Sequence, residues 1–466
     1  MIPMTLAEIA SVVGGEVEGD PTLTVLGPAF VDTRAPVESG LFVAVAGERV
    51  DGHDFADSAI EGGAVAVLGS RRTDAPTIVV ADPVVALGRL ARHVVDETRP
   101  TVLALTGSQG KTGTKDYLAH VLEGFGQTVA TVGNLNNEIG VPLTALRSTA
   151  HTTYLVVEMG ARGIGHVRYL CEVAPPQVSA VLNVGTAHLS EFGSREAIAQ
   201  AKGEIVESLP ESGVAVLNSD DDLTSAMTAR TMGRALTFGT TGDVAWRDVE
   251  LDDLGRPSFE LGYDGAWWPV RLTQSGAHQV ANAAAAAALA IAAGLPADVV
   301  ADRLGGATSA SPWRMEVHER SDGLIVVNDA YNANPASMAA AIDALVAIGD
   351  RRGRRTVAVL GEMLELGPTA ADAHRELGRL VAEAGVELLV TVGPAAGGIA
   401  EGAASVTHWS GTALPTAGRD EALAAVRENV AAADVVLVKA SRGAALEHIA
   451  DGLLDDGPHE RRATPC

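Results

Sequence analysis

The sequence predicts an α/β protein of three domains: a smaller N-terminal α/β domain, a central domain built on a parallel sheet, and a C-terminal Rossmann-like domain. Three observations predict this fold class. The chain has 466 residues, and domains average roughly 150 residues. Apolar runs of strand length alternate with helical patterns, which is typical of parallel sheets with crossover helices. One run, starting at Val102, ends in a glycine-spaced loop that a helical pattern follows.

Residues 1–100 form the first predicted domain. Thr5 and Glu8 have the spacing of a capping box, so a helix should begin directly after Thr5. Asp32, Thr33 and Arg34 precede a β-prone run, and such a triplet by itself indicates a solvated turn. The other expected elements are strands at 41–45 and 64–68 and a helix at 84–95.

Residues 101–315 form the central predicted domain. Its apolar runs predict strands at 102–105, 128–132, 154–157, 178–184 and 214–217. Short alternating runs between glycines then predict a small antiparallel appendage at 244–272. The alanine-rich run 280–295 is too short to span a bilayer and predicts a buried helix.

Residues 316–466 form the third predicted domain, another open α/β sheet. Strands are expected at 324–327, 356–360, 388–392 and 435–438, and helices at 336–348, 370–384 and 420–429.

The loop after Val102 carries the clearest chemical signal. Gly107 and Gly110 leave room for backbone N–H groups to face an anion, Lys111 can reach the outer phosphates, and the Thr112 hydroxyl can ligate magnesium. The general pattern would also have a glycine where this chain has Leu105. Because a strand precedes the loop and a helix follows it, the central domain is predicted to bind a nucleotide, as a phosphate-loop ATPase does.

Composition restricts the class of partner and the compartment. Lys and Arg total 34 against 59 Asp and Glu, so the net charge is −25, which argues against nucleic acid and anionic membranes. Two cysteines, Cys171 and Cys466, cannot form a disulfide framework and fit a reducing cytoplasm. No basic and apolar leader opens the chain, so no signal peptide is expected.

Polar residues gather after several central strands, where ligands of parallel sheets bind. Glu158 ends one strand and could join Thr112 on magnesium, and His188 follows another strand. Lys202 by its spacing is an ordinary helix-surface lysine. Asn282, inside an apolar helix, should have a hydrogen-bond partner, because an unpaired buried amide costs about 1–3 kcal/mol. Loops at 329–335 and 439–443 place acid, amides and cations at strand ends of the third domain.

These motifs together resemble the Mur ligase family, ATP-dependent enzymes that form amide bonds in peptidoglycan precursor synthesis. The resemblance covers essentially the whole chain and rests on nine segments in the family's order: 106–112, 134–142, 157–160, 186–194, 201–205, 278–283, 328–335, 360–367 and 439–442. Segments 134–142, 187–193 and 329–335 most resemble the branch that joins D-alanyl-D-alanine to UDP-N-acetylmuramoyl-tripeptide. The resemblance implies these two substrates. We expect a cytoplasmic protein from its cysteine usage, and we take a monomer as the default.

The resemblance implies ATP and Mg²⁺ as cofactors and assigns residues to each. Thr112 and Glu158 would hold one magnesium ion, His188 would help hold a second, and Lys202 matches a lysine that many members carbamylate. Lys111, His188 and Lys202 are thereby implied in catalysis. Asn282 would meet the adenine, Arg314 the phosphates and Asp329 the ribose. The nucleotide set comprises Gly107, Ser108, Gln109, Gly110, Lys111, Thr112, Gly113, Asn282, Arg314 and Asp329.

The substrates are assigned in the same way. Asp32, Thr33 and Arg34 resemble the uridine-nucleotide end of the site, and Lys439, Ser441 and Arg442 the part that meets the incoming dipeptide. Further substrate positions are Asn134, Asn137, Tyr331, Asn332 and Asn334. The chain departs from the family in having Trp313 before Arg314 and Ala440 after Lys439, where glycine is usual.

Other functions stay open from the sequence. A ligase that adds a single amino acid, or a folylpolyglutamate synthase, belongs to the same superfamily. A nucleotide-gated regulator on the same scaffold would bind ATP without releasing ADP in the presence of amine and carboxylate substrates.

Overall fold

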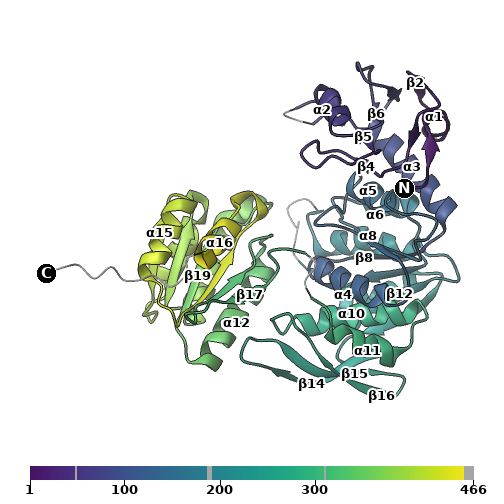
Figure 1. The fold of residues 1–466 in the computed structure, drawn as a ribbon. Coiled ribbons are helices and arrows are strands. Elements are labelled where there is room, and N and C mark those ends of the chain that lie inside the picture. The colour runs from purple at the N-terminus through teal and green to yellow at the C-terminus, as the bar shows by residue number, and fades with distance from the viewer. Residues whose placement is uncertain (48–49, 186–191, 309–310, 456–466) are drawn as a thin grey trace. The chain divides into compact units, whose positions relative to one another are not determined.

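The computed structural model describes residues 1–47, 50–185, 192–308 and 311–455 (Figure 1). The chain divides into two compact units. Unit 1 comprises residues 1–184, 195–244 and 285–300, and unit 2 comprises residues 185–194, 245–284 and 301–466. The mixed α/β fold predicted from the sequence is confirmed, whereas the limits placed at residues 100 and 315 stay predictions.

The N-terminal part of unit 1 contains a small, mostly parallel sheet. Helix α1 (Leu6–Val13) begins as predicted, because Thr5 and Glu8 form a reciprocal capping box. The strands lie in the order β2 (Glu16–Glu18), β7 (Thr77–Val79), β6 (Ala66–Gly69), β5 (Leu41–Val43) and β4 (Ala29–Phe30). Only the β2–β7 pair among them is antiparallel. Helix α3 (Pro83–Thr98) matches the predicted helix.

The second sheet of unit 1 carries the predicted phosphate loop. Six strands pair in parallel in the order β13 (Arg234–Phe238), β12 (Val214–Asn218), β11 (Val178–Val181), β8 (Thr101–Thr106), β10 (Tyr154–Glu158) and β9 (Thr128–Ala130). The apolar runs missed β13, because its residues alternate between buried and more exposed positions. The other five strands are those predicted.

Register brings the predicted polar residues to one edge of this sheet. Glu158 pairs with Leu105, and Val181 pairs with Thr106. The ends of β8, β10 and β11 therefore lie side by side, and helices α4 (Lys111–Glu123) and α8 (Arg195–Glu207) supply further side chains there.

The predicted antiparallel appendage is confirmed in unit 2. Strands β15 (Pro257–Tyr263) and β16 (Ala266–Arg271) pair antiparallel. Asp264 and Gly265 both have positive φ, as a tight two-residue hairpin turn requires. Strand β14 (Val244–Leu251) is the neighbour of β15. The alanine-rich run forms α10 (Gln279–Ala292), in which alanines 283–288 are almost wholly buried.

The C-terminal sheet of unit 2 has six strands in the order β17 (Glu316–Glu319), β18 (Ile325–Asn328), β22 (Val435–Lys439), β19 (Thr356–Leu360), β20 (Leu388–Val392) and β21 (Thr412–Thr416). All pairs are parallel except β17 with β18. The edge strands β17 and β21 were not predicted, since they contain exposed polar residues or a proline.

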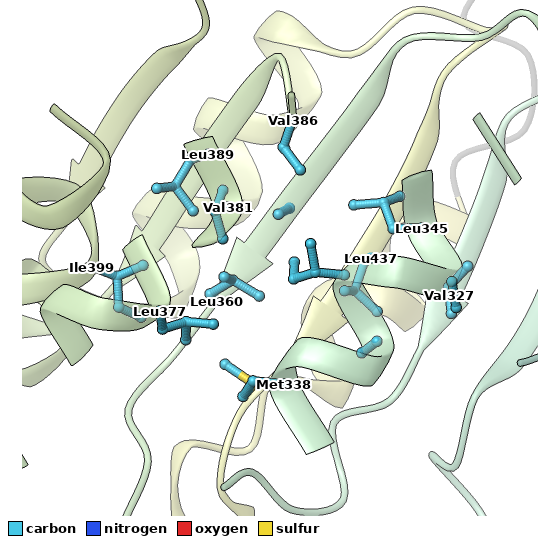
Figure 2. Close-up of a cluster of buried hydrophobic side chains, with 14 of the residues drawn as sticks. Val327, Met338, Leu345, Leu360, Leu377, Val381, Val386, Leu389, Ile399 and Leu437 are labelled. Carbon is cyan, nitrogen blue, oxygen red and sulfur yellow. The ribbon is translucent and has the colours of Figure 1, made fainter. Parts of the chain in front are cut away.

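Both faces of this sheet are covered by apolar side chains. One face packs on α12 (Pro335–Arg352) and α13 (Ala370–Glu383), and Figure 2 shows Met338 and Leu377 beside the strand residues Leu360 and Leu437. The other face packs on α15 (Arg419–Asn429) and α16 (Glu447–Asp455). Burial on two faces explains why the central strands are continuous apolar runs. Among the described helices, none is both long and apolar enough to cross a membrane.

Candidate active site

The phosphate loop follows β8 and opens α4. Gly110 has φ +76° and is the N-cap of α4, a conformation that favours glycine. A Cβ at Gly107 would come within 2.9 Å of the Leu182 Cβ, so the loop backbone packs closely against the chain after β11. The half-buried Lys111 lies in the first turn and donates from Nζ to the Gly107 carbonyl at 2.8 Å. A cation and a helix N-terminus thus meet at one place, as an anion site requires.

Glu158 and Thr112 lie together, as the sequence predicted from their strand-end and loop positions. The Thr112 hydroxyl donates to Glu158 Oε2 at 3.0 Å, and both side chains are almost wholly buried. Asn136 Nδ2 donates to the other carboxylate oxygen at 2.8 Å. The Thr131 hydroxyl also accepts the Glu158 backbone N–H, so the carboxylate end of β10 is held from several sides.

Asn183, which the sequence reasoning did not single out, holds the phosphate loop. Its Oδ1 accepts the backbone N–H groups of Ser108 at 3.0 Å and Gln109 at 2.9 Å. Its Nδ2 donates to the Gln109 carbonyl at 3.2 Å. The available signal was an amide residue directly after the apolar run of β11, at the same sheet edge as Glu158.

Lys202 is buried rather than on the helix surface, so the reading from helical spacing is wrong. Only 4% of the residue is exposed. Burial, with a smaller contribution from the charge of Lys111, lowers the pKa of Lys202 well below its ordinary value, and Glu158 opposes this shift. The spacing failed because α8 is covered on more than one side. Lys202 therefore belongs to the same group as Lys111 and Glu158.

Two contacts fix α8 on either side of Lys202. Arg230 lies against Gly203, leaving no room for a Cβ there, and donates to the Ala199 and Gln200 carbonyls at 3.0 and 2.9 Å. Glu204, wholly buried, accepts the backbone N–H groups of Gly165 at 2.5 Å and Arg168 at 3.1 Å. Its carboxylate thereby caps helix α6 (His166–Val173).

The other residues that the sequence predicted before position 200 occupy different settings. His188 lies outside the described residues. Asn137 accepts the N–H groups of Ile139 and Gly140, so its side chain caps the start of α5 (Gly140–Ala145). Asp32 and Arg34 form an exposed ion pair of 2.7 Å, which lowers the pKa of Asp32 to about 2. This geometry agrees with a solvated turn. Thr33 and Asn134 lie in loops.

In unit 2, Asp329 and Lys439 form a buried pair. Lys439 Nζ donates to Asp329 Oδ2 at 2.6 Å and to the Asn332 carbonyl at 2.8 Å. Asp329 Oδ1 accepts the Met315 N–H at 3.2 Å. Burial lowers the pKa of Lys439, and the charge of Asp329 opposes it. The pair and its contacts tie the segments around Met315 and Asp329 to the distant segment around Lys439.

Two cation–aromatic contacts extend this group. The Arg314 guanidinium lies 4.1 Å from the centre of the Tyr331 ring, and that of Arg442 lies 4.4 Å from the Trp313 ring. Arg442 also pairs with Glu447 at 2.7 Å. The residue Trp313, seen in the sequence only as a departure from the family motif, is therefore part of a stack.

The other predicted residues of unit 2 make structural contacts. The Ser441 hydroxyl accepts the Leu364 N–H at 2.9 Å and donates to the Ala333 carbonyl at 3.4 Å. Asn334 caps α12 in a capping box with Ser337. Asn332 Oδ1 accepts the Ala333 N–H. Asn282 has the partner expected of it, since its Nδ2 donates to Gln279 Oε1 at 3.0 Å.

Comparison with known proteins decides the family. Residues 105–290 match the Mur ligase middle domain, 313–442 the Mur ligase glutamate ligase domain, and 34–105 the Mur ligase family catalytic domain. A Mycobacterium tuberculosis protein named UDP-N-acetylmuramoyl-tripeptide–D-alanyl-D-alanine ligase is 43% identical, over 98% of each chain. The chain belongs to the Mur ligase family.

Solved structures resemble this Mur ligase over nearly its whole length. MurF from Acinetobacter baumannii is 32% identical with a TM-score of 0.87, covering 97% of this chain and 99% of that chain. MurF from Thermotoga maritima, solved in complex with ADP, is 30% identical with a TM-score of 0.76, covering 91% and 96%. The three-domain fold expected from the sequence is thereby confirmed.

The residues around Thr112 fit a magnesium ion. Two hard oxygen donors, the Thr112 hydroxyl and Glu158 Oε2, lie 3.0 Å apart in a buried setting. The part of the chain that the structure describes contains no cluster of three or more His, Cys, Asp or Glu that could hold a metal. Magnesium suits such a sparse set, because it usually keeps several waters and takes its other ligands from substrate phosphates.

Proposed function

We propose that this Mur ligase joins D-alanyl-D-alanine to UDP-N-acetylmuramoyl-tripeptide with ATP, releasing ADP and phosphate. The observation that carries the proposal is the grouping of Lys111, Thr112, Glu158 and Lys202 at one sheet edge. The name of the 43% identical relative supports the choice of substrates. The ADP complex of the Thermotoga maritima structure supports the nucleotide.

In the proposed reaction, the tripeptide carboxylate attacks the γ-phosphorus of ATP and ADP leaves, giving an acyl phosphate. The amine of D-alanyl-D-alanine then attacks the acyl carbon, phosphate leaves, and the amine proton is lost. The first step brings two anions together. Lys111, beside the loop and the α4 N-terminus, would offset that repulsion, since phosphoryl transfer depends mainly on positioning and electrostatic stabilisation.

We propose that Thr112 and Glu158 hold Mg²⁺, with His188 and Lys202 near a second ion. When bound, the metal would neutralise charge on the phosphates. Lys202 supports this through its burial, because a lowered pKa favours the neutral amine, which is the form that can add CO₂ to become a carbamate. Asn183 would keep the loop shaped for the phosphates.

For unit 2 we propose that Asn282 meets the adenine, Arg314 the phosphates and Asp329 the ribose. Lys439 donates to Asp329 and to the Asn332 carbonyl, which supports a positioning role beside its expected contact with the dipeptide. Lys439 would order the loop that carries Ser441 and Arg442. Residues 1–100 would bind the uridine nucleotide, 101–315 ATP, and 316–466 the dipeptide.

We further propose that the protein works as a monomer in the cytoplasm, where ATP and the nucleotide-linked precursor are available. Its product would feed peptidoglycan synthesis and so support cell shape and division.

The test is phosphate release by the purified protein with ATP, Mg²⁺ and UDP-N-acetylmuramoyl-tripeptide, with and without D-alanyl-D-alanine. Release that requires the dipeptide, with the mass gain of one dipeptide in the nucleotide product, is expected. Release that instead requires a single amino acid, or folate and glutamate, would assign another branch. ATP binding without release for any acceptor would overturn the enzymatic proposal.

A further inference from the structure

Trp313 has a backbone conformation that side-chain-bearing residues rarely adopt. Its φ is +59°, and Met315, two residues later, has φ +49°. Both lie in the left-handed region, which is unfavourable for residues with a Cβ. Arg314 is held between them. Such a conformation persists only when the surrounding contacts determine it.

Contacts on two sides hold the Trp313 ring. The ring is half-buried and packs on the apolar cluster that includes Ala440 and Leu446. Its other contact is Arg442, whose guanidinium lies 4.4 Å from the ring centre. Arg442 donates from Nη1 to Glu447 Oε1 at 2.7 Å, and the Glu447 side chain is only 6% exposed. A planar guanidinium can satisfy an aromatic face and a carboxylate together.

The backbone of Trp313 continues the connection. Its carbonyl accepts the Tyr331 N–H at 3.2 Å, and the Tyr331 ring lies 4.1 Å from the guanidinium of Arg314. Three segments, 312–315, 329–333 and 439–447, are therefore joined by an alternating set of rings and guanidinium groups. The Asp329–Lys439 pair joins the same three segments through buried polar contacts.

We propose that Trp313 is a positioning residue for the acceptor substrate. By stacking on Arg442, it fixes the 439–442 loop against the segment that carries Arg314, and so sets the affinity for D-alanyl-D-alanine. The inference rests on the proposed function, because it takes the dipeptide as the ligand of that loop. It assigns to Trp313 a task that the family motif, with glycine at this position, does not contain.

A purely structural Trp313 would act differently. Loss of packing alone lowers the stability of the unit and the amount of active protein, which reduces kcat per mole of protein and leaves KM unchanged. Loss of the stack leaves Arg442 held by Glu447 but no longer by the ring, so the loop is less ordered before binding and must be ordered further at each binding event. That cost raises KM for the dipeptide more than it lowers kcat.

Two substitutions at Trp313 separate these effects. Trp313→Phe retains an aromatic face, and Trp313→Leu retains an apolar side chain against the core but removes that face. We expect Trp313→Leu to raise KM for D-alanyl-D-alanine roughly 3- to 30-fold, the range for losing one cation–π contact. Trp313→Phe should change it less, and kcat should change little in both variants.

The chain offers a control in a second stack of the same kind. Arg247 lies 4.1 Å from the ring centre of Trp267 on β16, a residue outside the proposed site. Trp267→Leu should leave the dipeptide KM unchanged. Arg442→Gln and the Trp313→Leu/Arg442→Gln double variant complete a cycle. If the two residues act as a unit, the double variant should have the dipeptide KM of the single variant with the larger increase. Independent residues would instead give the product of the two increases.

Results that contradict the proposal are specific. An unchanged dipeptide KM in Trp313→Leu, or effects of Trp313→Leu and Arg442→Gln that multiply, would overturn it. If Trp313→Leu fails to fold, the test passes to Arg442→Gln, and an unchanged dipeptide KM in that variant would also overturn the proposal. Phosphate release by the wild-type protein that does not require D-alanyl-D-alanine would instead refute the proposed function. The phosphate-release assay on the wild type detects this before any variant is made.

Discussion

The two groups of candidate residues use the same residue types in different ways. Around the phosphate loop of unit 1, Lys111, Thr112, Glu158 and Lys202 gather around one buried point. In unit 2, the polar residues after β18 and β22 mostly bond to one another and to the backbone of neighbouring loops. A polar cluster after an apolar strand can therefore be a site for ligands or a network that holds loops. Side-chain distances distinguish the two, and sequence motifs do not.

Lysine use makes the contrast sharper. The chain has lysine at only four positions: 111, 115, 202 and 439. Lys111 is half-buried and the other three are almost wholly buried, so arginine supplies the surface cations of the described chain. Burying an ammonium group is costly. Each lysine thus marks a place where a cation or an amine is needed, which makes lysine substitutions the most direct test of the comparison.

The largest effect is expected at Lys111. Lys111→Ala should reduce turnover by on the order of 10³ to 10⁵, the range for removing a cation that stabilises the transferring phosphoryl group. The thermal unfolding midpoint should change little, since Lys111 is half-buried. Steady-state phosphate release and calorimetry measure both quantities. Glu123→Ala, at the exposed end of the same helix, is the control. Full activity in a folded Lys111→Ala protein would refute the role.

The next effect concerns Lys439. Lys439→Met should lower the free energy of unfolding by about 3–5 kcal/mol, because it leaves Asp329 buried without its cation. Urea denaturation measures this. The Asp329→Asn/Lys439→Met double variant should recover part of the loss, since no unpaired charge remains. A Lys439→Met protein with wild-type stability and only a raised dipeptide KM would make the unit 2 group resemble the candidate ligand site of unit 1, and the comparison would fail.

Lys202 should give a smaller, pH-dependent effect. Its pKa is lowered in the folded state, so between the folded and the ordinary value the unfolded chain binds the extra proton. Stability then rises with pH by at most about 1.4 kcal/mol per unit. Lys202→Met removes this term, so its advantage over wild type should be greatest at low pH and shrink as pH rises.

Urea denaturation at a series of pH values tests the Lys202 prediction. Ile205→Met, a buried substitution on the same helix without a titrating group, provides the reference. A stability difference between wild type and Lys202→Met that stays constant across the series would contradict the lowered pKa.

The smallest effect on stability is expected at Arg34. The Asp32–Arg34 pair is exposed, so Arg34→Ala should change the free energy of unfolding by less than about 0.5 kcal/mol. The pKa of Asp32 should rise from about 2 toward its ordinary value, which carboxyl NMR titration detects. If the pair meets the uridine nucleotide, KM for the nucleotide substrate rises while stability does not. A large loss of stability would show that this turn is structural.

Much of the fold could be predicted because the central strands are buried on both faces. Runs such as 356–360 and 388–392 match β19 and β20 residue for residue. In the central and C-terminal sheets, the strands β13, β17 and β21 were missed because they carry polar residues or proline, and their alternating or mixed composition does not differ from that of a loop. In the N-terminal sheet, β2, β4 and β7 were not predicted, since each has only two or three residues. The helix α14 (Gly397–Ala404) was missed because glycines interrupt its pattern.

The candidate site was predicted unevenly for a related reason. Thr112 and Glu158 could be paired from the sequence, because the ends of parallel strands share one edge. Asn183 was missed, since one amide after a strand is a weak signal. Lys202 looked exposed because helical spacing reports only which residues share a face.

By itself, the sequence determined the order of strands and helices, the position of the phosphate loop and the family, since each depends on local patterns or contiguous motifs. Only the tertiary structure decided which charges are buried, which partners they have, and that Trp313 lies on Arg442. Those properties depend on contacts between segments far apart in the chain, such as Thr112 with Glu158, 46 residues apart, and Asp329 with Lys439, 110 residues apart. Local patterns carry no information about contacts across such separations.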